Sequence, residues 1–209
     1  MAQRMIHYAI AKKLTETGYI KDEYRFCLGS IIPDSNDRTG EEYNRVHYIL
    51  KEGTKKTFDF TRFFKENKKL VLENDMYLGY YIHLITDVIY RNFLYDVKGL
   101  RNRRQEENFT EKLHSDYHNL NYIVKTEYSL EKLVVDTQDV PKEFGLSKID
   151  ELQDRLDEEF KDEHVSDLNY ITSDILKEFM EYILPILKTE VKNIKEKEKS
   201  MLNSKDYLY

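Results

Sequence analysis

Apolar residues recur along most of the chain at the three- and four-residue spacing of amphipathic helices. The first example lies within residues 1–17, where Met5, Ile6, Ile10 and Leu14 share one face and lysines occupy other positions. The pattern predicts that this segment is a helix of the mature fold.

The same spacing predicts further helices separated by short polar loops. The clearest begins at Asn74 and runs to about Val97. A loop is expected from Gly29 to Asp37, where turn-forming residues cluster, and Pro185 is expected to kink the last long helix. The other predicted helices span about residues 21–28, 42–51, 59–67, 106–135 and 146–160, with a final one capped by Ser166 or Asp167.

These elements predict an all-α fold. The chain has 209 residues, which is enough for one domain with a sizeable core. Its 7 Gly and 3 Pro are too few for the frequent turns of a β-sandwich or barrel. We therefore predict a single all-α domain over residues 1–209, a multi-helix bundle in which residues 121–209 form supporting helices.

Composition and charge exclude several classes of protein. The formal net charge of −6 gives no general electrostatic support for nucleic-acid binding. Cys27 is the only cysteine, which excludes a disulfide framework and a thiolate metal site. No signal-peptide pattern is visible, and no apolar run approaches the ~18 residues of a membrane span. A cytoplasmic location is the expectation.

The strongest chemical signal is the pair His83 and Asp87, four residues apart within the most apolar predicted helix. This spacing places both side chains on one helix face, as in helices that offer two ligands to one metal. A buried carboxylate is costly unless a cation or several donors compensate it. A divalent metal would do so; alternatively, Asp87 pairs with an arginine and His83 is a hydrogen-bonded core residue.

Other histidines and a carboxylate extend this signal. His114 and His118 form a second pair with helical spacing, and His7, Asp34 and His47 lie on three separate segments. Helical metalloproteins assemble their sites from ligands on separate helices in this way. Nitrogen and carboxylate ligands suit zinc, and also iron, manganese or nickel.

Four short blocks resemble the zinc-dependent phospholipase C family, an all-α fold shared with single-strand-specific nucleases. In chain order they are MIHYAIAKKL, FCLGSIIPDS, RVHYIL and LGYYIHLITD. The resemblance covers roughly the first 90 residues and extends more weakly to about residue 120. It implies a phospholipase C-like bundle with a metal site between helices, whose ligands lie within residues 1–120.

The resemblance also implies roles for individual residues. His7 matches the ligand of the N-terminal helix, and His47 and His83 match two imidazole ligands of one metal. Asp34 matches a loop carboxylate that is either a ligand or the general base beside the attacking water. Asp87 matches a carboxylate that bridges two metals, which would lie ~3.5–4 Å apart.

The chain also departs from this family. It has no Trp, whereas the secreted enzymes begin with a Trp that binds metal. Phe93 stands where the family has a histidine, and HSDYH stands where it has HSxYE, so that His114 is retained or the third metal site is lost. We expect loss of that site, which leaves one or two ions.

The predicted function is that of a metal-dependent, zinc-type hydrolase of phosphate esters, acting on a small phosphoester or a phospholipid head group. Arg91, four residues after Asp87, is a candidate phosphate contact, although it can equally pair with a helix carboxylate. The alternative is a non-catalytic member of the fold with a structural metal or a partner-binding role. An HD-type phosphohydrolase ranks below both, because the chain contains no adjacent His-Asp dipeptide.

Overall fold

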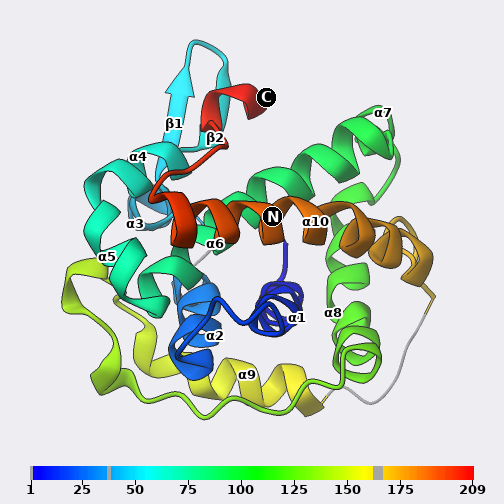
Figure 1. Cartoon of the computed structure of the whole chain (residues 1–209). Coiled ribbons are helices and arrows are strands. Elements are labelled where there is room, and N and C mark those ends of the chain that lie inside the picture. The colour runs from blue at the N-terminus through cyan, green and yellow to red at the C-terminus, as the bar shows by residue number, and fades with distance from the viewer. Residues whose placement is uncertain (1, 37–38, 162–166) are drawn as a thin grey trace.

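Helices dominate the computed structural model, which describes residues 2–36, 39–161 and 167–209 (Figure 1). The all-α prediction is confirmed, with one addition: a small antiparallel sheet of β1 (Ile49–Glu52) and β2 (Lys55–Phe58). The helices are α1 (Arg4–Thr15), α2 (Glu23–Ile31), α3 (Gly40–Val46), α4 (Phe60–Glu66), α5 (Lys68–Glu73), α6 (Asp75–Asn92), α7 (Leu100–Arg103), α8 (Phe109–Glu127), α9 (Leu152–Lys161) and α10 (Ser173–Lys197).

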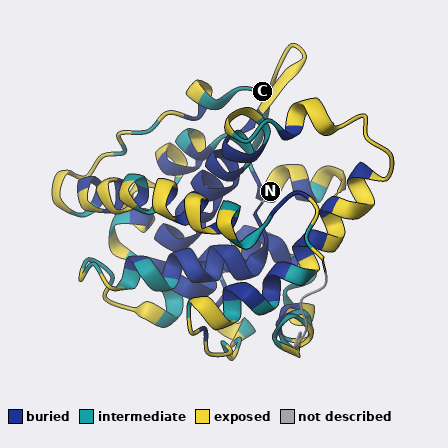
Figure 2. Ribbon diagram, turned by 90° about the vertical axis from the view of Figure 1, so that its right-hand side faces the viewer, coloured by how far each residue is buried: buried dark blue, intermediate teal, exposed yellow. Residues whose placement is uncertain are grey.

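Helix α6 forms the centre of the core. Every residue from Asp75 to Tyr90 is buried, because α1, α2, α4, α5 and α10 all pack against this helix. Figure 2 shows the buried residues gathered in the helices at the middle of the molecule. This enclosure explains why the sequence of α6 has no continuous polar face. None of the helices in the described ranges is long and apolar enough to cross a membrane.

Two glycines allow α2 and α6 to approach each other closely. A Cβ atom on Gly29 would lie 2.1 Å from the carbonyl oxygen of Met76, and one on Gly79 would lie 2.1 Å from that of Phe26. The expectation that a helix ends near Gly29 is therefore wrong. Helix α2 continues to Ile31 and leads into a 3-10 turn, because this glycine serves backbone packing rather than helix termination.

The helix expected over residues 42–51 is also shorter than predicted. Helix α3 ends at Val46, and Tyr48 adopts a left-handed conformation with φ of 52°. The chain then turns into the hairpin β1–β2, in which Ile49 pairs with Phe58. Lys56 on β2 also exchanges two backbone hydrogen bonds with Tyr209, of 2.9 and 3.1 Å. Figure 1 shows that end of the chain beside the hairpin.

The later helices differ from the prediction mainly at their ends. Helix α8 ends at Glu127, and the following residues to 136 have no regular structure. Helix α10 begins at Ser173, where the side chain of Thr172 accepts a hydrogen bond from the amide of Ile175. Pro185 lies inside this helix. His164 and Ser166, of which Ser166 was considered as a helix cap, lie outside the described residues.

A buried carboxylate ties α8 to the segment that precedes α10. Oδ1 of Asp116 accepts hydrogen bonds from the backbone and side-chain nitrogens of Asn169, at 2.7 and 3.0 Å. Oδ2 accepts from the amides of Tyr170 and Ile171, at 2.6 and 3.0 Å. Asp116 is fully buried, so these four donors satisfy the charge that would otherwise be costly in the core.

The Asp116→Asn variant is therefore expected to be destabilised. The amide group of asparagine cannot accept at both positions, so two of the four donors lose their acceptor. The free energy of unfolding should fall by roughly 2–4 kcal/mol. Urea unfolding followed by circular dichroism measures this change. Glu111→Gln, on the exposed side of the same helix, is the control and should leave stability within about 0.5 kcal/mol.

Candidate metal centre

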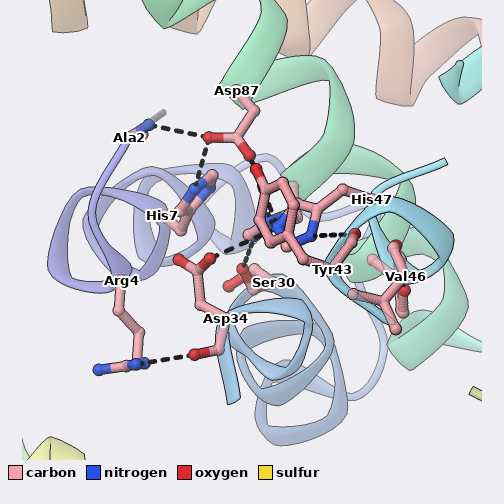
Figure 3. Close-up of polar contacts among 11 residues, drawn as sticks. Ala2, Arg4, His7, Ser30, Asp34, Tyr43, Val46, His47 and Asp87 are labelled. Carbon is pink, nitrogen blue, oxygen red and sulfur yellow. Dashed lines mark hydrogen bonds and ion pairs between the residues drawn. The ribbon is translucent and has the colours of Figure 1, made fainter. Parts of the chain in front are cut away.

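Five side chains from separate parts of the chain meet inside the helical core (Figure 3). Their side chains are at most 3% exposed. Together they form two overlapping groups of possible metal ligands, one of His7, His83 and Asp87 and one of Asp34, His47 and His83. The structure thus brings together the main candidates from the sequence: His7 on α1, Asp34 in the turn after α2, His47 directly after α3, and His83 and Asp87 on α6.

Backbone carbonyl groups orient two of the imidazole rings. Nδ1 of His83 lies 2.8 Å from the carbonyl oxygen of Ser30, and Nδ1 of His47 lies 3.2 Å from that of Tyr43. A carbonyl oxygen only accepts hydrogen bonds, so each Nδ1 carries the proton and each Nε2 keeps a free lone pair. This is the arrangement in which a histidine binds metal through Nε2 while a neighbouring acceptor fixes the ring.

The free lone pairs converge with the carboxylate oxygens. The two Nε2 atoms of His47 and His83 are 3.3 Å apart. Asp34 Oδ1 lies 3.5 Å from His47 Nε2, and Asp87 Oδ2 lies 3.6 Å from His83 Nε2. Ligands bound at ~2.0–2.1 Å in a tetrahedron are separated by about 3.3–3.4 Å. The distances of His47 Nε2 from His83 Nε2 and from Asp34 Oδ1 are therefore close to those between ligands of one ion, whereas Asp87 Oδ2 lies 3.9 Å from His47 Nε2 and belongs to the other group of candidates.

His7 approaches the other side of Asp87. Its Nε2 atom lies 3.3 Å from Asp87 Oδ1, and the backbone amide of Ala2 donates a 2.8 Å hydrogen bond to the same oxygen. The ring of His7 stacks on that of His83, with centroids 3.9 Å apart. The two oxygens of Asp87 face different imidazoles. This carboxylate therefore lies close to residues of both groups of candidate ligands.

The protonation states suit metal binding. Burial lowers the pKa of His83 to about 3, so the ring is neutral. Burial alone would raise the pKa of Asp34, but the imidazoles of His47, His83 and His7 beside it bring the pKa well below its usual range. The pKa of Asp87 is lowered in the same way, mainly through His7 and His83. Neutral imidazole and ionised carboxylate are the forms that bind metal.

Several acceptors in this centre have no donor. Within the described ranges, Asp34 Oδ2 and Asp87 Oδ2 accept no hydrogen bond, and no arginine pairs with Asp87. The alternative in which Asp87 is the partner of an arginine therefore has no support in the contacts. A cation between these groups would satisfy both oxygens and the facing nitrogen lone pairs.

Arg4 is a supporting residue that the sequence did not single out. Its Nη2 atom donates a 2.9 Å hydrogen bond to the carbonyl oxygen of Asp34, and its Nη1 atom pairs with Glu159 on α9. Arg4 is only 4% exposed. It therefore holds the turn that carries Asp34 in place. The only sequence signal was a charged residue beside the apolar face of the first helix.

The pair of His114 and His118 does not join the centre. Both residues are exposed on α8, and within the part of the chain that the structure describes neither belongs to a group of possible ligands. Their four-residue spacing does place them on one side of the helix, but Leu113, Tyr117 and Leu120 form its buried side. Phe93, at the position where the phospholipase C family has a histidine, is buried and packs against Phe179 with centroids 5.4 Å apart.

Arg91 lies one helical turn beyond Asp87 on α6. Its guanidinium group contacts the rings of Tyr95 and Tyr209 rather than a carboxylate. Its Nη1 atom is buried and has no hydrogen-bond acceptor among the described residues. The alternative in which Arg91 pairs with a helix carboxylate is therefore not observed in that part of the chain.

The fold and the centre define a helical protein with a candidate metal site of three histidines and two aspartates. Comparisons with protein-family models, with curated proteins and with solved structures returned no match to this chain.

Proposed function

We propose that the protein is a metal-dependent hydrolase of phosphate esters that uses zinc or a similar divalent ion. The observation that supports this most is the cluster of five buried histidine and aspartate side chains, in which Asp34 Oδ2, Asp87 Oδ2 and the ring nitrogens of His7 have no hydrogen-bond partner among the described residues. Nitrogen and oxygen ligands without a thiolate favour zinc, and they also suit iron, manganese or nickel.

The proposal gives each residue a role. Asp34, His47 and His83 would hold one ion, His7 would bind a second, and Asp87, which lies near all three imidazoles, would serve both. A divalent ion in such a site activates water and neutralises charge on a phosphoryl group. In a one-ion centre, Asp34 is instead free to accept a proton from the attacking water. Arg91, one turn of α6 beyond Asp87, contacts a phosphate group of the substrate.

A metal analysis followed by an activity assay tests the proposal. Protein purified without chelators is expected to contain about one or two transition-metal ions per chain, as measured by mass spectrometry. It should hydrolyse bis(p-nitrophenyl) phosphate or p-nitrophenyl phosphate, lose this activity with a chelator and regain it with added zinc. Protein that neither retains nor takes up a transition metal would contradict the proposal.

A second candidate is a structural metal site without catalysis. The near-complete burial of all five side chains favours it, because a substrate must reach at least one ion. Bound metal together with chelator-sensitive thermal stability, but no hydrolysis of either ester, would support this candidate over the enzyme.

A further inference from the structure

Cationic and aromatic side chains alternate at the end of α6, beside the metal centre. The guanidinium carbons of Arg104 and Arg91 each lie 5.1 Å from the ring centroid of Tyr95. Arg91 also lies 2.9 Å from the ring centroid of Tyr209, and Nζ of Lys56 lies 5.8 Å from that centroid. We call these five residues, Arg104, Tyr95, Arg91, Tyr209 and Lys56, the cationic ladder.

The cations of this ladder have no acidic partners in the described ranges. Nearby arginines do: Arg101 pairs with Asp96, and Arg103 pairs with Glu106. No described carboxylate forms an ion pair with Arg91, Arg104 or Lys56, and each of these cations lies against a tyrosine ring instead. The ladder therefore gathers three positive charges without an ion-pair partner in the described ranges, whereas the neighbouring Arg101 and Arg103 are paired.

This arrangement is electrostatically unfavourable as it stands. Burial lowers the pKa of Arg91 to about 10, and the charges of Arg101 and Arg104 add to the effect. Burial and the charges of Arg91, Lys51 and Arg104 likewise lower the pKa of Lys56. A bound anion would relieve this repulsion and could accept the unused hydrogen bond of Arg91 Nη1.

We propose that the cationic ladder binds a phosphate group, and that the substrate of the hydrolase carries this second phosphate in addition to the ester that is cleaved. Arginine forms paired hydrogen bonds with phosphate oxygens, and lysine adds a point charge. Arg91 follows Asp87 by one turn of α6, so the ladder begins next to the centre. The binding of phosphate to the ladder does not depend on the proposed function. The inference that this phosphate is part of the substrate rests on the proposed function.

Calorimetric titration of the metal-free protein with inorganic pyrophosphate and phosphate tests the binding. Saturable binding is expected, with pyrophosphate bound more tightly than phosphate. Arg104→Gln and Lys56→Gln should each weaken it by about 3–10-fold. Both residues are exposed, so the fold is not at risk. The matched controls Arg101→Gln and Arg103→Gln remove the same charge from paired residues and should change the affinity less than about 2-fold.

Absence of saturable binding, or equal weakening by the control variants, would overturn the ladder as an anion site. Failure of the proposed function is distinguishable, because a protein without metal would still bind pyrophosphate. The metal-loaded protein is then assayed with a nucleoside 3′,5′-bisphosphate and the matching 5′-monophosphate. A kcat/KM preference of about 10-fold for the bisphosphate, lost in Arg104→Gln, is expected. Equal values for both substrates would refute the second phosphate as a substrate feature.

Discussion

Replacing Gly29 with alanine is expected to destabilise the protein severely, by more than ~3 kcal/mol, or to prevent folding. In an ordinary helix this change would add about 1 kcal/mol of stability. Here the new Cβ atom would lie 2.1 Å from the carbonyl oxygen of Met76, a backbone atom that cannot move without shifting α6. Gly79→Ala should behave alike, since its Cβ would meet the backbone of Phe26 at the same distance.

Chemical unfolding of both variants measures this effect, with Gly18→Ala as the control. Gly18 has a φ of 77°, and a Cβ atom added there would have no atom within 4 Å outside its immediate chain neighbours, so only the ~1–2 kcal/mol cost of a left-handed residue applies. Similar losses at positions 18 and 29 would contradict the close helix contact. If Gly29→Ala folds, it should also bind metal more weakly, because the adjacent Ser30 carbonyl orients His83.

Asp87→Asn is expected to weaken metal binding by at least ~100-fold, more than the usual effect of a supporting residue. The variant keeps the shape of the side chain but removes its charge and one acceptor from a centre in which Asp87 faces all three imidazoles. The metal-free variant should be less stable than the unmodified protein, because the lowered pKa of Asp87 means that folding stabilises its charge beside His7 and His83. Competition with a chromophoric zinc chelator measures the affinity, and urea unfolding measures the stability.

Asp116→Asn is the matched control for this experiment. Both aspartates are fully buried, but the oxygens of Asp116 accept four hydrogen bonds from residues 169–171 and lie in neither group of candidate ligands. Its variant should lose stability and keep the metal. Equal metal affinities for Asp87→Asn and the unmodified protein would remove Asp87 from the centre.

The sequence predicted the central helix well, because the long apolar run of this helix is compatible with few other structures. The spacing of His83 and Asp87 indicated that both side chains lie on one helix face. Because α6 is buried, that face lies inside the core. The same spacing places His114 and His118 together on one side of α8, but that side is exposed. Helical spacing places two residues together, but only the packing of α8 decides whether they face the core or the solvent.

Other features had no sequence signal of their own. Ser30 and Tyr43 orient the imidazoles through backbone carbonyls, which every residue type possesses. The hairpin depends on the left-handed backbone conformation of Tyr48. Tyrosine rarely adopts this conformation, so the residue at this position gave no sign that α3 ends there. The contact of Lys56 with Tyr209 joins residues far apart in the chain, so local patterns could not reveal it.

The pairing of Tyr209 with β2 has a consequence for assembly. A strand at the edge of a sheet exposes unpaired amide and carbonyl groups, to which a strand from another molecule can add. On β2, the outward-facing groups of Lys56 are already occupied by the backbone of Tyr209. The chain thus blocks its own sheet edge against intermolecular strand addition, and displacement of residues 203–209 would make that edge available to a second molecule.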